Sequence, residues 1–178
     1  MSFIVRDLIL TLVLVPSVIG DCLEYRIRNP IILVGLLFGL LYQIITFNLY
    51  GFQNWLSGCI LPILILGILF LVKVLGAGDI KLFSVIGGFY GSHFVLRTIV
   101  VSFIIGALLS IIQLIRYGNL VNRLQYLAKF ISECFREKEL RSYYEASRDG
   151  RSCVIHFSIA IAIAVFLCLQ YEQLGYIF

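Results

Sequence analysis

Charged residues are scarce in this sequence. Of its 178 residues, 13% are charged, which is about half the share in a typical soluble domain. By contrast, 61% are hydrophobic and the mean hydropathy is +1.01. A soluble domain of this length could not bury that much apolar surface. The composition therefore predicts a membrane protein, and it excludes a disordered chain, a nucleic-acid-binding protein and a disulfide-stapled secreted domain.

Paired cysteines and clusters of metal ligands are lacking as well. The five cysteines are scattered without a C-x-x-C pair, which argues against a zinc knuckle or a redox pair. Neither His93 nor His156 has a cluster of carboxylates or cysteines nearby in the sequence, so we expect no metal site and no cofactor. The sequence also shows no Ser–His–acid or Cys–His arrangement at one membrane depth and no G-x-x-x-x-G-K-[ST] phosphate loop.

Long apolar runs, however, recur along the chain. About 20 apolar residues cross a bilayer as a helix, the form in which every backbone polar group is satisfied internally. Six runs fit, at about 3–20, 30–50, 55–75, 80–92, 94–115 and 153–171. The first is alternatively a secretory signal, and the short, glycine-interrupted fourth is alternatively a re-entrant segment. We therefore predict an all-α polytopic membrane protein with about six transmembrane helices, in which residues 1–178 form a single transmembrane domain.

Positive charges are divided unevenly between the predicted loops. If the first span ends in the cytoplasm, loops 21–29, 73–81 and 116–152 lie inside the cell. Of the 14 lysines and arginines, only Arg6 and Arg97 then lie outside. This strong positive-inside bias predicts that both chain termini lie outside the cytoplasm.

The long inner loop, 116–152, carries an apolar pattern of its own. Apolar residues recur there at three- and four-residue spacing, with basic residues among them. They are Leu120, Leu124, Leu127, Ile131 and Phe135. The pattern predicts a basic amphipathic helix lying on the inner leaflet.

Two aspartates stand at the inner ends of predicted spans. Asp21 directly follows the first span, and Asp79 follows the third across a short glycine-containing turn. Two close carboxylates share a proton, because two adjacent negative charges are costly. The ionised member can then take a proton from a water that attacks a peptide carbonyl, while the protonated member donates to the developing oxyanion. The pair predicts an aspartic protease site at the cytoplasmic face.

The residues around Asp79 suit such a site. Gly76 and Gly78 permit unusual backbone angles and leave room for a substrate strand. Asp79 can begin the next helix, where exposed N–H groups stabilise a negative charge, and Lys81 can pair with a carboxylate. The alternative interpretation is that Asp79 is only a helix cap and Lys81 only an anchor at the membrane interface.

The segment Gly76-Ala77-Gly78-Asp79-Ile80-Lys81-Leu82 resembles the G-x-G-D-x-K-L signature of type IV prepilin peptidases, which are membrane aspartic proteases of the GxGD class. In that family the other aspartate closes an early span and precedes a short Ile-Pro-Asn-like stretch. Here Asp21 precedes Ile27-Arg28-Asn29. The resemblance extends from about the first span to the last.

The resemblance implies an activity and a set of residues. The implied activity is removal of the short basic leader from prepilin-like precursors at the cytoplasmic face of the cell membrane, without a cofactor. Asp21 and Asp79 are the implied catalytic residues, with support from Gly76, Gly78, Lys81 and Asn29. Recognition of a basic leader by charge would use the aspartates or Glu24.

The sequence also departs from the family pattern. Arg28 stands where the family's first motif has proline, and the late Pro-Phe-x-Pro-like stretch is here Ile155-His156-Phe157-Ser158. We interpret His156 as a hydrogen-bonding histidine at the membrane interface rather than as a third catalytic group. The chain has no N-terminal segment with paired cysteines, so we expect a peptidase-only form that resembles tight-adherence pilus prepilin peptidases and archaeal preflagellin peptidases.

Two other functions fit parts of the pattern. Another GxGD protease would use the same aspartates on transmembrane segments, but such relatives usually hold their aspartates deeper within helices. A small transporter or assembly factor would bind ions or protons at the aspartates. Transporters often show inverted repeats and broken helices near mid-membrane, and no repeat is visible here. The protease is therefore the favoured prediction.

Overall fold

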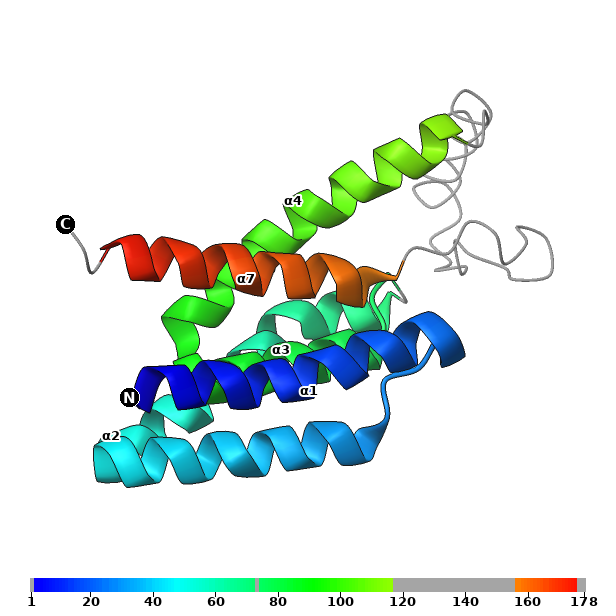
Figure 1. The fold of residues 1–178 in the computed structure, drawn as a ribbon. Helices are drawn as coiled ribbons and strands as arrows, with labels where there is room; N and C mark the ends of the chain where they lie inside the picture. Colours follow the sequence, from blue (N-terminus) through cyan, green and yellow to red (C-terminus); the bar gives the residue numbers. More distant parts are fainter. Residues whose placement is uncertain (1, 73, 117–155, 176–178) are drawn as a thin grey trace. The chain divides into compact units, whose positions relative to one another are not determined.

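The computed structural model describes residues 2–72, 74–116 and 156–175 (Figure 1). Their helices are α1 (Ser2–Glu24), α2 (Asn29–Leu71), α3 (Ala77–Tyr90), α4 (Ser92–Arg116) and α7 (Phe157–Gly175). These residues contain no strand, which confirms the all-α prediction. The amphipathic helix predicted within 116–152 lies almost wholly outside the described residues.

The chain divides into two compact units. One comprises Met1–Ile105 together with His156–Phe178, and the other comprises Gly106–Ile155. Of the second unit the structure describes only the last turns of α4. The first unit contains α1, α2, α3, α7 and the first half of α4, and it holds the candidate site.

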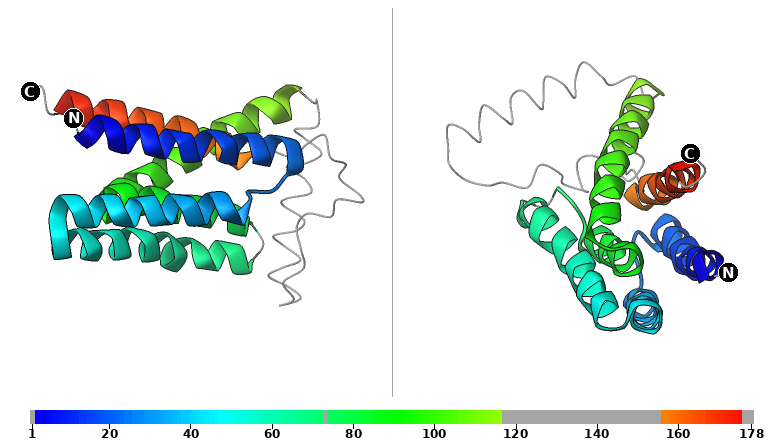
Figure 2. Two further views of the ribbon diagram at one scale, coloured as in Figure 1. Left: turned by 60° about the horizontal axis from the view of Figure 1, so that its bottom comes forward. Right: turned by 90° about the vertical axis from the view of Figure 1, so that its left-hand side faces the viewer.

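Helix α2 is a hairpin of two helical arms rather than one rod. Asn48 has non-helical backbone angles (φ 55°, ψ −131°) and separates the arms. A Cβ atom on Gly51 would lie 1.9 Å from the Gln43 carbonyl oxygen, so a residue without a side chain is required at this bend. The Trp55 Nε1 donates to the Leu36 carbonyl at 3.2 Å, across the two arms. They lie side by side in Figure 2 and correspond to the predicted second and third spans.

Helix α3 is the central helix of the first unit. Its 14 residues measure about 21 Å at a rise of ~1.5 Å per residue, less than the ~30 Å hydrocarbon core of a bilayer. Every residue from Leu82 to Phe89 is buried. The backbones of α3 and the second arm of α2 touch, because a Cβ on Gly87 would lie 2.1 Å from the Gly58 carbonyl oxygen. Gly91, at φ +84°, ends the helix.

The outer surfaces of these helices are apolar. Large hydrophobic side chains are exposed along the whole length of α2, among them Leu33, Ile45, Leu64 and Leu71. Among the described residues, α2 and residues 92–113 of α4 are long and apolar enough to cross a membrane. An exposed apolar surface of this extent fits contact with lipid rather than with water.

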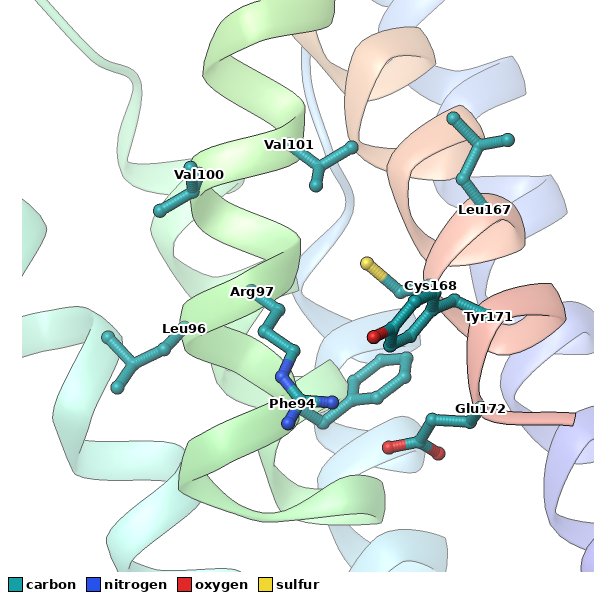
Figure 3. A pocket seen from close by; sticks show the side chains of 9 residues that line it. All are labelled: Phe94, Leu96, Arg97, Val100, Val101, Leu167, Cys168, Tyr171 and Glu172. Atoms are coloured by element: carbon teal, nitrogen blue, oxygen red, sulfur yellow. The ribbon is translucent and has the colours of Figure 1, made fainter. Parts of the chain in front are cut away.

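An apolar cavity of about 560 Å³ lies between the first turns of α4 and the last turns of α7 (Figure 3). Phe94, Val101 and Leu167 line it, with Arg97 and Glu172 at its polar side. Since α7 contacts Asp21 through its opposite end, at Ser158, this cavity is separate from the candidate site.

Candidate active site

Both predicted catalytic aspartates lie at one end of the first unit. The carboxyl end of α1 and the amino ends of α2, α3 and α7 gather there, at the right in Figure 1. Asp79 lies in the first turn of α3. Asp21 lies in the last turns of α1, which continues to Glu24, so the helix extends about one turn beyond the predicted span 3–20. The structure nevertheless brings together two aspartates that are far apart in the sequence.

The link between α1 and α2 is ordered by backbone geometry. Tyr25 has a positive φ of 53°, a conformation common just after the last turn of a helix, and its N–H donates to the Asp21 carbonyl at 2.9 Å. Pro30 stands in the first turn of α2, where its missing N–H costs nothing. Ile27, between these points, is buried against α3.

The glycines of the turn before Asp79 are needed for space. Gly76 has ordinary extended angles (φ −75°, ψ 146°) and Gly78 is helical. A Cβ on Gly76 would lie 3.2 Å from the Asp79 Oδ2, and one on Gly78 would lie 3.3 Å from the Ile27 side chain. Neither glycine therefore uses the unusual backbone angles that it permits. The Ile27 side chain fills the space beside Gly78. The α1–α2 link is therefore packed against α3.

Asp79 occupies an environment that favours its protonated form. Burial, first, and the negative charge of Asp21, second, raise the pKa of Asp79 to about 7. A hydrogen bond from the Gly76 backbone N–H opposes this rise in pKa. Asp79 stands three residues after the N-cap residue Gly76, so this bond is one half of a capping box. Part of the helix-cap interpretation is thus correct, but a carboxyl group that titrates near neutral pH is also suited to acid–base chemistry.

Asp21 has different neighbours, which come from α7. The Ser158 hydroxyl donates to the Asp21 Oδ2 at 2.5 Å. The His156 Nδ1 lies 3.6 Å from the same oxygen, a contact that the sequence did not predict. Ser158 was missed as a site residue because 137 positions separate it from Asp21. The available signal was its place as the polar residue that opens the last apolar helix, at the membrane face predicted for Asp21.

The two remaining predicted support residues contact each other. The Lys81 Nζ donates to the Asn29 Oδ1 at 3.0 Å, and both side chains are exposed. The bond joins the amino end of α2 to the first turns of α3. Lys81 therefore pairs with an amide here, rather than with a carboxylate.

Glu24, the residue predicted to recognise a basic leader, is paired within the chain. Arg28 donates from Nε to the Glu24 Oε2 at 3.2 Å and from its second terminal nitrogen to Oε1. The hydrogen bonds and the charge of Arg28 lower the pKa of Glu24. Arg28, which stands in place of the family's proline, thus forms an exposed ion pair beside the site.

One known protein family matches this chain. No curated protein and no solved structure matches the chain significantly. The family model described as the type IV leader peptidase family matches residues 8–111, more than half of the chain. The matched region contains Asp21, the turn before Asp79 and Lys81, and it ends before α7. The chain belongs to the type IV leader peptidase family.

Proposed function

We propose that this protein is a prepilin leader peptidase that hydrolyses the leader of type IV pilin-like precursors at the cytoplasmic face of the membrane. The observation that carries the proposal is that Asp79, in the first turn of α3, interacts electrostatically with Asp21 at the same end of the first unit. Burial, first, and this interaction, second, raise the pKa of Asp79 to about 7. A carboxyl group that holds its proton near neutral pH beside a second aspartate is what aspartic proteolysis requires.

The chemistry follows from the pair. One aspartate is ionised and accepts a proton from a water, whose oxygen attacks the scissile carbonyl carbon. The other gives its proton to the carbonyl oxygen, so that a neutral diol forms without a free oxyanion. Collapse of the diol breaks the C–N bond as the leaving nitrogen is protonated, and the pair returns to its singly protonated state.

The setting of the site supports a membrane-bound substrate. The first unit presents exposed apolar helix faces, and the site lies at its end, where exposed Arg26, Arg28 and Lys81 also lie. Under the positive-inside rule this end faces the cytoplasm, and both termini lie outside. Since Glu24 is paired with Arg28, recognition of a basic leader by charge rests more on the aspartates.

A cleavage assay tests the proposal. The enzyme is co-expressed with a prepilin-like substrate from the same genome, and the cleavage site is read by mass spectrometry of the product. We expect Asp21→Asn and Asp79→Asn each to lower cleavage about a thousandfold or more, and the double variant to do little more, because the two act as one unit.

Asp7→Asn is the matched control. Asp7 accepts a hydrogen bond from Tyr90, away from the site, and an asparagine oxygen can accept the same bond. It should cleave like the wild type. Substantial cleavage by either aspartate variant would refute the two-aspartate mechanism, and failure of folded wild-type protein on several pilin-like substrates would favour a transporter or assembly factor.

The helical position of Asp21 also favours a second candidate. Relatives that cut transmembrane segments hold their aspartates within helices, and Asp21 lies within α1 rather than after it. Such a protease would use the same pair on a substrate helix. Cleavage inside the hydrophobic helix of the substrate, rather than before it, would select this candidate.

A further inference from the structure

The amino end of α7 surrounds one oxygen of Asp21. Both the Ser158 Oγ, at 2.5 Å, and the His156 Nδ1, at 3.6 Å, approach the Asp21 Oδ2. Ser158 is fully buried. The His156 Nδ1 is also buried and has no hydrogen-bond partner among the described residues. A buried nitrogen without a partner is costly, and the carboxylate of Asp21, 3.6 Å away, is an acceptor that could satisfy it.

The ring of His156 is held in this position by α1. Tyr25 stacks on it with 5.0 Å between the ring centroids and a tilt of 34°. Tyr25 reaches His156 because its positive φ turns the chain at the end of α1, where its N–H bonds back to the Asp21 carbonyl. The Asp21 backbone thus bonds to Tyr25, and the Asp21 carboxylate lies beside His156, which contacts Tyr25 in turn.

The two aspartates therefore have unequal surroundings. An ionised carboxylate only accepts hydrogen bonds, and a donor directed at it favours that form. Asp21 has the Ser158 hydroxyl as a donor and the His156 nitrogen nearby. Asp79 has a single backbone N–H and is otherwise desolvated. This difference in hydrogen-bond donors suits the two aspartates to different roles.

Building on the proposed function, we propose that Ser158 and His156 are positioning residues that hold and orient the Asp21 carboxylate through its Oδ2, so that Asp21 is the general base and Asp79 the general acid. Because Oδ2 is occupied by Ser158, Oδ1 is the oxygen that receives the proton of the attacking water. Asp79 gives its proton to the carbonyl oxygen. In the second step Asp21 protonates the leaving nitrogen, the C–N bond breaks, and a hydroxyl proton of the diol returns to Asp79.

This assignment rests on residues outside the matched part of the chain. The family match ends at residue 111, whereas His156 and Ser158 belong to the start of the last helix. Other charged and titratable side chains lie on the elements packed around Asp21 at this end. Those are Cys22, Glu24, Arg26, Arg28, Asp79 and Lys81. Glu24 and Arg28 neutralise each other, and Lys81 bonds to Asn29.

The pH dependence of kcat/KM tests the assignment. The low-pH side of this profile, the acid limb, reports loss of the base's charge, and the high-pH side, the basic limb, reports loss of the acid's proton. Ser158→Ala removes a donor to the Asp21 carboxylate, so the acid limb should move to higher pH by about one unit. The basic limb should stay in place. At pH values below that limb kcat/KM should fall about tenfold, because one pH unit on a limb of unit slope is a factor of ten. If the roles were reversed, the basic limb would move instead.

Two further variants separate positioning from folding. Ser158→Thr retains the hydroxyl and should restore the wild-type acid limb. Ser17→Ala removes a buried hydroxyl that bonds only to the Val13 carbonyl and should leave both limbs unchanged. Adding His156→Gln to Ser158→Ala should move the acid limb further, and an unchanged limb would remove His156 from the proposal.

The outcomes distinguish the two proposals. If Asp21→Asn and Asp79→Asn are inactive but folded Ser158→Ala has the wild-type acid limb, the positioning role is wrong and the protease proposal stands. A movement of the basic limb instead would overturn the assignment of base and acid. If the aspartate variants remain active, the protease proposal is wrong, and the positioning role that rests on it is wrong as well.

Discussion

At the scale of single residues, the proposed chemistry depends on four side chains at one end of the first unit: Asp21, Asp79, His156 and Ser158. The importance of the two aspartates is predictable from the sequence, because a carboxylate beside an apolar span is costly and rarely incidental. The difference between them is not predictable, because it comes from α7. Ser158 is an ordinary serine in the sequence, and only its contact with Asp21 gives it a role.

The pKa of Asp79 leads to a prediction about stability. A folded-state pKa of about 7, raised from 3.8, means that the folded protein holds this proton more tightly than the unfolded chain does. The stabilisation from that proton is fully present below about pH 4 and is lost as pH rises through about 7. Above pH 8, Asp79→Asn should therefore unfold at a higher temperature than the wild type, by at least about 2 °C.

Thermal unfolding in detergent at pH 5 and pH 8.5 measures this effect. The difference in midpoint between Asp79→Asn and wild type should grow with pH, whereas Asp7→Asn should show no such growth. A constant difference would mean that Asp79 carries no raised pKa in the folded protein. Activity should fall over the same range, since the general acid loses its proton.

At the scale of helices, close backbone contacts rather than side-chain size set the arrangement. Apolar runs predicted where the helices lie, because length and hydropathy are local properties. They did not predict that the second and third spans form one hairpin bent at Asn48. Nor did they predict that α3 is enclosed by its neighbours. Both features depend on pairs such as Gly58 and Gly87, which are 29 positions apart but touch through their backbones.

Two glycines in the same arm of α2 test this contact. A Cβ on Gly58 would lie 2.0 Å from the Gly87 carbonyl oxygen, whereas one on Gly67 would meet nothing within 4 Å. Gly58→Ala should lower the free energy of unfolding by at least about 1–3 kcal/mol, the usual cost of overpacking. Gly67→Ala should be neutral or stabilising by up to about 1 kcal/mol, because alanine favours the helix. Equal effects in a detergent unfolding assay would contradict the packing described for α3.

At the scale of the whole molecule, the two ends of the first unit differ in charge. Arg26, Arg28 and Lys81 lie at the end that holds the aspartates, whereas the hairpin tip of α2 around Tyr50 carries no charge. The positive-inside rule can be applied to a sequence because it counts residues near span ends. It then predicts that the aspartates face the cytoplasm and that the hairpin tip faces outward.

Cysteine labelling measures this orientation directly. In an otherwise cysteine-free protein that still cleaves its substrate, Arg26→Cys and Tyr50→Cys place one exposed thiol at each end, since both native side chains are exposed. A membrane-impermeant maleimide should label Tyr50→Cys in intact cells and Arg26→Cys only after permeabilisation. The proposed substrate carries its basic leader at the cytoplasmic face, so a site on the outer face would not reach the leader. The reverse labelling pattern would therefore contradict both the orientation and the proposed leader cleavage, even if the two aspartates proved essential for another reaction.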